Sequence, residues 1–311
     1  MTAGWVASAV RARAMSSRRL GATDTRRLAS SPGLAEAQSM LASTPYGHQV
    51  RPGQTLSEAQ QAVSATLLWN LRVLAGWVPH GDARVLRVLA GGFEIANTDE
   101  CLRELSGSES DPPFRLGTLG TTGNRIATAG SLVQVRDILA HSVWGDPGAD
   151  TVAAIHLGMR LSWATRVAAI VPDARPWAAG AAALLVAREV VVAGRRPTAE
   201  AVWLAAPLLG SSWLAADTLP ALVAALPQRA RWSLDFVRNP ADLWRAEAAW
   251  WARVERDGFS LLHRPVTTSA PVIGMAAVLG VDAWRVRAAL TVAAHGGDLS
   301  PAALEAFDAV A

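Results

Sequence analysis

The chain has 311 residues, 51% of them hydrophobic, so it can bury a large core and is long enough for two or three domains. Its formal net charge is +3, and all 29 basic residues are arginine, because the sequence contains no lysine. This excludes a Walker A phosphate loop, a pyridoxal Schiff base and a protein-kinase site, since each of these needs a lysine. The arginines are spread along the chain rather than clustered, which argues against nucleic-acid binding.

Location can also be predicted from composition. The N-terminal arginines are not followed by an apolar stretch, so we expect no secretory signal. Cys101 is the only cysteine, which excludes an internal disulfide and suits a reducing compartment. The longest apolar segment, 177–187, ends at Arg188 and is too short for a membrane span, so it predicts a buried core helix. We therefore expect a cytoplasmic protein, with at most a peripheral association with membranes.

Helices are predicted almost throughout. Alanine, leucine and arginine dominate, and apolar residues recur at intervals of three and four, which predicts an all-α fold. Asn239 followed by Pro240 and Asp242 is typical of a helix start, and we expect that helix to run to Gly258. Segments rich in glycine, proline or small polar residues predict the loops, at 52–53, 106–113, 117–130, 145–148, 172–176, 194–197 and 267–271.

An internal repeat is the most informative pattern. The segment 34–47, LAEAQSMLASTPYG, aligns without a gap with 132–145, LVQVRDILAHSVWG, at an offset of 98 residues. The shared positions include two leucines, an aromatic residue and a glycine. A weaker third copy, 219–226, keeps the seven-residue spacing of the leucines but not the aromatic-glycine ending.

Each copy continues into a helix that contains tryptophan, at Trp69, Trp163 and Trp244. An apolar helix with a single acidic residue follows, and these acids are Glu94, Glu189 and Asp282. The repeated order predicts three similar helical lobes, at 1–112, 113–197 and 198–311.

Four short motifs resemble a known family. The segment from Trp5 to Met15 carries Arg11-x-Arg13 and precedes the leucine helix and the turn Thr44-Pro-Tyr46-Gly, while 93–103 and 278–287 provide acidic helices further on. In this order the motifs resemble the C (or d) subunits of V/A-type rotary ATPases. Tyrosines and a lysine-glutamate pair that are usual in the family are replaced here, by Trp5 and by the segment 280–282.

The resemblance implies a fold and a role. Three helical lobes would form a pseudo-threefold funnel whose base rests on the proteolipid ring and whose cavity accepts the end of the central shaft. The implied function is a non-catalytic coupling subunit that transmits torque. Its partners would be central-stalk subunits of the D and F type and the ring, and the ring would provide the only contact with the membrane. No cofactor is implied.

Few residues suggest other chemistry. None of the six histidines, among them His80, is paired at the spacing of a zincin helix, so we expect no metal site. The glycine-rich segment 117–123 is similar to a phosphate cradle, but no predicted strand precedes it and no lysine follows, so we expect a plain loop. Neither a serine nucleophile elbow nor the paired aspartates of helical terpenoid synthases occur. We therefore expect no catalytic and no cofactor-binding residue.

The acids on apolar helices need partners if they are buried. We propose from the sequence that Glu94, Glu189 and Asp282 take part in ion pairs that fix how the lobes meet. The candidate cations are Arg11, Arg13 and Arg285. Arginines near the N-terminus can equally be solvated or contact acidic partner surfaces.

Three functional hypotheses remain. The first is the coupling subunit, the second is a diverged stand-alone helical scaffold with the same fold, and the third is a helical enzyme of another kind. Genes for an ATPase shaft and ring beside this one would favour the first over the second. A cluster of polar side chains in a closed pocket would favour the third.

Overall fold

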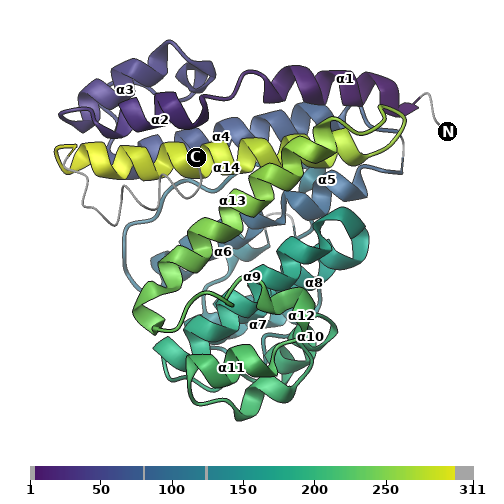
Figure 1. The fold of residues 1–311 in the computed structure, drawn as a ribbon. Coiled ribbons are helices and arrows are strands. Elements are labelled where there is room, and N and C mark those ends of the chain that lie inside the picture. The colour runs from purple at the N-terminus through teal and green to yellow at the C-terminus, as the bar shows by residue number, and fades with distance from the viewer. Residues whose placement is uncertain (1–3, 80, 123–124, 298–311) are drawn as a thin grey trace. The chain divides into compact units, whose positions relative to one another are not determined.

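The computed structural model describes residues 4–79, 81–122 and 125–297, and this part of the chain is all helix, turn and loop (Figure 1). The all-α prediction is confirmed, and no strand occurs among these residues. The helices are α1 (Gly4–Ser16), α2 (Gly21–Ala29), α3 (Leu34–Ala42), α4 (Leu56–Ala75), α5 (Arg84–Leu89), α6 (Gly91–Leu105), α7 (Leu132–Ala140), α8 (Val152–Ile170), α9 (Arg175–Ala187), α10 (Ala199–Leu209), α11 (Leu219–Ala225), α12 (Gln228–Arg231), α13 (Leu243–Leu262) and α14 (Ala270–Ala294).

Short helical turns connect several of these helices. They are η1 (Pro45–His48), η2 (Gly117–Leu119), η3 (Ile126–Thr128), η4 (Pro172–Ala174), η6 (Ser212–Ala215) and η7 (Pro240–Asp242), together with one π-helical turn, η5 (Arg188–Val192). The three leucine segments of the repeat form α3, α7 and α11. The apolar segment 177–187 lies in α9, where most of its residues are buried.

Hydroxyl side chains start many of the helices. Thr55 and Glu58 form a capping box at α4, in which each side chain bonds the backbone N–H of the other residue. Thr151 accepts from the third residue of α8 in the same way. The predicted start at Asn239 is confirmed, because its side chain accepts from the N–H of Ala241 at 3.0 Å. These caps satisfy N–H groups that the first turn of a helix leaves without a partner.

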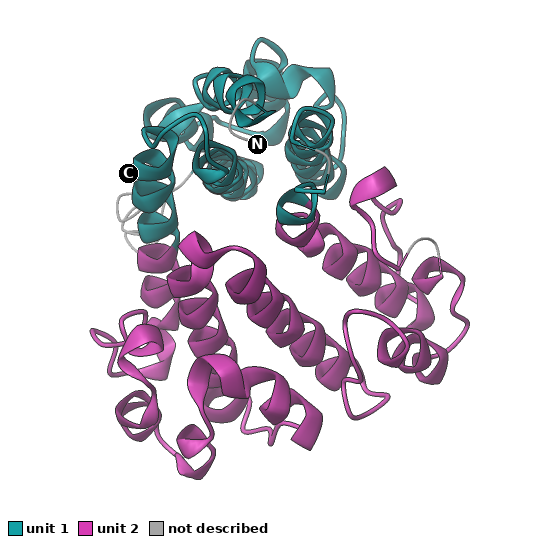
Figure 2. Cartoon of the chain, turned by 90° about the vertical axis from the view of Figure 1, so that its right-hand side faces the viewer, with its two compact units in different colours: residues 1–86, 251–311 teal, residues 87–250 magenta. Residues whose placement is uncertain are grey.

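The chain divides into two compact units, residues 1–86 with 251–311 and residues 87–250 (Figure 2). In the first unit α1, α2 and α4 pack on α14, so the first and last parts of the sequence share one core. That core joins Leu28, Leu41, Val63 and Leu290. The boundaries of the three lobes expected from the repeat differ from those of these two units, and the lobes stay a prediction.

The second unit contains its own core. Helices α8 and α9 pack on each other, and α6, α10 and α12 pack on this pair. The buried cluster around α6, α7 and α8 includes Leu102, Leu139, Trp144 and Ile155. Each unit therefore buries an apolar cluster of its own.

Two glycines bring α13 and α14 together in the first unit. A Cβ atom at Gly274 would lie 2.6 Å from the carbonyl oxygen of Gly258 and 2.9 Å from the nitrogen of Leu262. Neither backbone atom can move aside cheaply, so glycine is required at this crossing. Helix α13 continues through Gly258 to Leu262, beyond the end that we expected, and Gly258 leaves room for the close crossing. Trp251 and Trp284 stack nearby, with ring centroids 5.4 Å apart.

We predict that Gly274→Ala lowers the free energy of unfolding by more than 2 kcal/mol, because the new methyl group overlaps backbone atoms. Gly280→Ala is the matched control on the same helix. A Cβ there meets nothing within 4 Å, and alanine is favoured over glycine in a helix by about 1 kcal/mol. Urea unfolding followed by circular dichroism measures both. Equal stability of the two variants would contradict the close crossing.

Candidate functional site

Glu94 of α6 lies at the centre of a buried polar cluster in the second unit, which we call the Glu94 cluster. Its side chain is 3% exposed. One carboxylate oxygen accepts the backbone N–H groups of Thr121 and Thr122. The other accepts the Thr121 hydroxyl at 2.5 Å and the indole N–H of Trp144 at 2.8 Å. Four donors thus stabilise a buried negative charge that would otherwise be very costly.

Asp282 of α14 forms a similar arrangement in the first unit, the Asp282 cluster. The residue is 1% exposed. Its oxygens accept the backbone N–H groups of Leu20 at 3.0 Å and Gly21 at 2.8 Å, just before α2. The Tyr46 hydroxyl donates to the same carboxylate at 2.7 Å. The cluster thereby fixes two N-terminal segments to a helix about 240 to 260 residues later in the sequence.

The two clusters follow the internal repeat. Tyr46 and Trp144 occupy equivalent positions, 98 residues apart, in the turns that follow α3 and α7. Each donates a side-chain hydrogen bond to the buried acid of another copy. Trp144 of the second copy donates to Glu94 of the first, and Tyr46 of the first copy donates to Asp282 of the third. In both clusters two successive backbone N–H groups complete the site. The repeat is therefore a repeat of polar contacts as well as of leucines.

Burial is the largest influence on Tyr46. It raises the pKa of the phenol well above 10.0, and the negative charge of Asp282 and the hydrogen bond to it raise this pKa further. All three effects favour the neutral phenol, which is the form that can donate. The hydrogen bond between the two side chains is therefore maintained across the neutral and mildly alkaline range.

A tryptophan contact accompanies the Glu94 cluster. Trp163 of α8 donates from Nε1 to the carbonyl of Val88 at 2.6 Å. Its ring occupies the space beside Gly91, where a Cβ would lie 2.8 Å from the ring, and Trp144 covers the same glycine at 3.4 Å. Gly91 is therefore small because two indole rings pack on it.

The same arrangement recurs further along the second unit. Trp250 donates to the carbonyl of Trp177 at 2.8 Å, again three residues before a glycine, Gly180. Trp232 packs on that glycine, with 2.6 Å between its ring and a Cβ placed there. Three residues after Gly180, at the position that Glu94 takes after Gly91, the chain has Ala183, which is fully buried. This junction has lost its acid and is apolar.

The candidate ion-pair residues have partners other than those expected. Arg285 is 2% exposed and forms a bidentate pair with Glu255, at 2.5 and 2.6 Å. Glu189 lies on η5, where it pairs with Arg195 six residues later. Glu189 therefore stabilises a local turn. It lies in η5, beyond the end of α9 and of its apolar segment.

The N-terminal arginines do not contact the buried acids. Arg11 stacks over the ring of Trp77, with 4.0 Å to the ring centroid. Arg13 donates to the carbonyls of Leu262 and Arg264 at 2.7 and 2.8 Å, and so caps the end of α13. The expected pairing of these arginines with Glu94 or Asp282 is corrected by these contacts, because backbone N–H groups and aromatic donors already satisfy both acids.

A different arginine lies near Glu94. The guanidinium of Arg166 is 5.0 Å from the ring centroid of Trp144. Burial lowers the pKa of Arg166, and the negative charge of Glu94 partly offsets this effect. The Arg166 cation and the Glu94 carboxylate therefore attract each other, and the Trp144 ring contacts both groups.

The glycine-rich segment 117–123, for which a phosphate cradle was the alternative, binds a carboxylate of the chain itself. Thr121 and Thr122 of the glycine-rich segment bind Glu94, so this loop serves a carboxylate of its own chain, while Gly123 lies outside the described residues. Among the residues that the structure describes, no three His, Cys, Asp or Glu side chains are grouped as metal ligands, and His80 is not among these residues. No helix in the described ranges is long and apolar enough to cross a bilayer.

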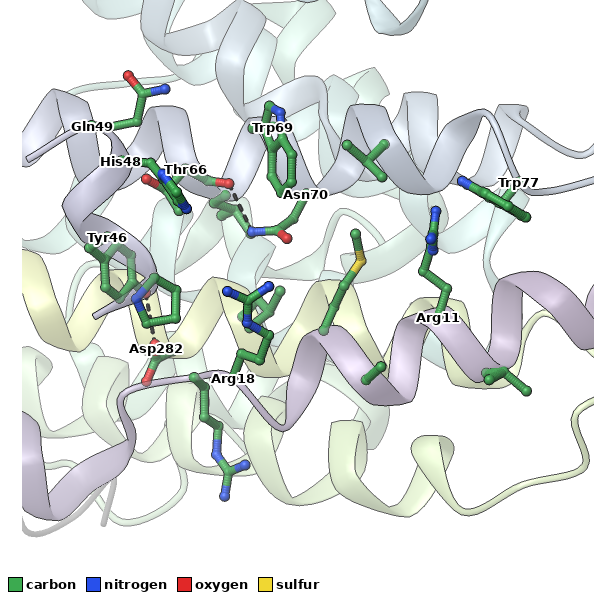
Figure 3. A pocket seen from close by; sticks show the side chains of 18 of the residues that line it. Arg11, Arg18, Tyr46, His48, Gln49, Thr66, Trp69, Asn70, Trp77 and Asp282 are labelled. Carbon is green, nitrogen blue, oxygen red and sulfur yellow. Dashed lines mark hydrogen bonds between the residues drawn. The ribbon is translucent and has the colours of Figure 1, made fainter. Parts of the chain in front are cut away.

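A groove of about 1060 Å³ lies between α1 and α4 in the first unit (Figure 3). Both helices pack on α14, whose Leu279 and Asp282 line the groove as well. Gly4 lies beside Pro79 just after α4, so the helices are antiparallel. Figure 3 shows Arg11 and Arg18 directed from α1 toward α4.

Reasoning from the sequence did not identify the aromatic donors or the backbone donors of the two clusters. The acids and the aromatic residues were both noted, but separately. Their constant order was the available signal, since an acid on one copy precedes an aromatic turn in the next. For Asp282 the same order applies only if the first copy is taken to follow the third, so that Asp282 precedes the turn with Tyr46.

The geometry defines an all-α protein whose helix repeats are joined by buried carboxylates and indole contacts. Residues 9–148 match the family model described as ATP synthase (C/AC39) subunit, somewhat less than half of the chain. This segment is therefore similar to the C/AC39 subunit family of the V/A-type ATPases, in agreement with the resemblance noted from the sequence. It includes Tyr46, Glu94 and Trp144. A comparison with curated proteins gave no match.

We predict that Tyr46, the only tyrosine, does not ionise near pH 10 while the protein is folded. A raised folded pKa means that the contribution of this group to stability is complete below pH 10 and is lost as the pH rises through the folded pKa. Absorbance at 295 nm during an alkaline titration measures the phenolate.

Unfolded protein in urea is the control and should titrate near the ordinary value. Asp282→Asn should lower the folded pKa toward that value, because the neighbouring negative charge is removed. Ionisation of folded wild-type protein at the same pH as the unfolded control would contradict the buried hydrogen bond.

Proposed function

We propose that the chain is a non-catalytic coupling subunit of a V/A-type proton-translocating ATPase, which joins the central shaft to the proteolipid ring and transmits torque. The family match over residues 9–148 is the observation that carries this proposal. The partners would be central-stalk subunits of the D and F type and the ring. The subunit would lie at the cytoplasmic face and touch the membrane only through the ring.

The physical features of the chain suit such a role. A body that transmits torque must resist deformation, and close-packed helices with few voids do so. Buried charges with several donors also favour one arrangement of the helices, because any slippage would leave a buried charge unsatisfied. The Asp282 cluster fixes the N-terminal segments to α14 in this way, and the Arg285–Glu255 pair adds a second buried tie in the same unit.

We predict that the tagged chain co-purifies with the shaft and ring subunits of the same organism when all are co-expressed and the membranes are solubilised in mild detergent. An unrelated tagged helical protein, expressed with the same subunits, gives the background. Mass spectrometry of the eluate identifies the partners.

Recovery of both shaft and ring above background supports the coupling role. Recovery of neither from a folded chain would contradict it and favour the stand-alone scaffold of the same fold.

A further inference from the structure

We propose that the groove between α1 and α4 binds an amphipathic helix of a partner protein, with acidic residues along the edge that faces α1. The inference goes beyond the coupling role, because it concerns the chemistry of the bound segment, whichever complex supplies it. It rests on three observations: exposed apolar side chains, an unbalanced positive charge, and the shape of the groove.

Large apolar side chains are exposed in the groove. Trp69 of α4 and Trp77, two residues after its end, are 53% and 46% exposed, and Val10 of α1 is 57% exposed. Figure 3 shows both tryptophans along one side of the groove. Indole rings exposed side by side with aliphatic residues are typical of binding surfaces, because burying them gives a large gain at little cost in conformational entropy.

The repeat explains why this site is open. Leu67 lies twelve residues after the capping Thr55, as Trp163 lies twelve after Thr151. Leu279 lies three residues before Asp282, where the other two junctions have a glycine. At the groove, Leu67 therefore takes the place of the tryptophan, and Leu279 takes the place of the glycine on which the tryptophan ring would pack. Trp69, two residues after Leu67, lines the groove.

The charge of the groove is positive. Arg11, Arg18 and Arg19 line it, and Asp282 is the only acid among the described lining residues. Asp282 already accepts three hydrogen bonds, from Tyr46 and two backbone N–H groups. The exposed side chain of Arg18 makes no ion pair or hydrogen bond with the described residues. Guanidinium groups beside an apolar surface favour carboxylates, so the complementary segment is acidic and apolar.

The dimensions suit a helix. From Thr66 to the end of α4 at Ala75 the helical wall of the groove is about 14 Å long, or between two and three turns, at 1.5 Å per residue, and Trp77 extends it beyond the helix. The volume, about 1060 Å³, is at the upper limit for small-molecule pockets. A straight groove between two antiparallel helices accepts a third helix through side chains at positions i, i+3, i+4 and i+7. We therefore assign the groove to a helix of about three turns.

The test uses a fluorescein-labelled synthetic helix of 15 residues, with leucines at positions i, i+3, i+4 and i+7 and glutamates along one edge. Fluorescence anisotropy measures its binding to the full chain. Saturable binding is expected, and a peptide with glutamine in place of every glutamate should bind at least tenfold more weakly. The failure of the acidic peptide to bind would overturn the proposal.

Variants locate the site. Arg18→Glu should weaken binding at least tenfold, whereas Arg72→Glu, an exposed arginine of α4 outside the groove, should change it less than twofold. Trp69→Ala should weaken binding by a similar factor, and Trp203→Ala, 75% exposed on α10, should not. A peptide with arginine in place of glutamate should bind Arg18→Glu better than wild type. Equal loss in the paired variants would overturn the proposal.

A lipid is the alternative occupant that the test separates. Vesicles of phosphatidylcholine and phosphatidylglycerol in a 3:1 ratio should not compete with the peptide. Competition by the vesicles that is abolished by Trp69→Ala would assign the groove to a membrane surface and contradict the proposal. Because none of these measurements involves the ATPase, their outcome is independent of the co-purification experiment.

Discussion

A buried carboxylate must have all of its negative charge satisfied, and this requirement organises both units of the chain. Glu94 and Asp282 lie on otherwise apolar helices and are almost fully buried. Each is held by two successive backbone N–H groups and by one aromatic donor. Removing a donor from such a site costs about 1.5 to 3 kcal/mol, a large fraction of the stability of a typical domain. We therefore expect these hydrogen bonds to hold the loops that supply the donors in place.

The clusters give the internal repeat a physical meaning. In the first unit the Asp282 cluster joins the last helix to segments near the start of the chain, and in the second unit the Glu94 cluster joins α6 to the turn after α7. The junction at Gly180 keeps the indole contacts but has the buried Ala183 in place of an acid. At the α1–α4 groove the acid is kept, but the indole that would close the junction is absent. Without the acid, the contact at Gly180 is apolar. Without the indole, the space between α1 and α4 is an open groove.

Much of the fold could be predicted from the sequence, because the helices depend on local features such as apolar periodicity and capping residues. The periodicity predicted an all-α chain, Asn239 predicted a helix start, and the leucine repeat predicted α3, α7 and α11. The acids at 94 and 282 were noted as groups that would need partners if they were buried, and both are buried. Glu189 was noted with them but is not buried, since position along an apolar helix does not show where that helix ends and the π-helical turn begins.

The partners of the acids could not be predicted, for a different reason. We expected arginines because opposite charges are the simplest way to satisfy a buried carboxylate. Two backbone N–H groups and an aromatic donor do this equally well, and backbone donors leave no trace in the amino-acid sequence. The groove was also hidden, because it arises from the absence of a contact between distant segments. Family resemblance indicated a role for the chain, whereas only the three-dimensional arrangement indicated which side chains are left without a neighbour.

Amide hydrogen exchange tests most directly the claim that the two carboxylates hold their loops. In the wild-type chain the N–H groups of Leu20, Gly21, Thr121 and Thr122 should exchange as slowly as those of the adjoining helices. Asp282→Asn should speed exchange at Leu20 and Gly21 at least tenfold and leave Thr121 and Thr122 unchanged, because an amide has one acceptor oxygen and turns its NH₂ toward a donor. Glu94→Gln should have the converse effect. Fast exchange at all four groups in the wild type, or no change in either variant, would contradict the account.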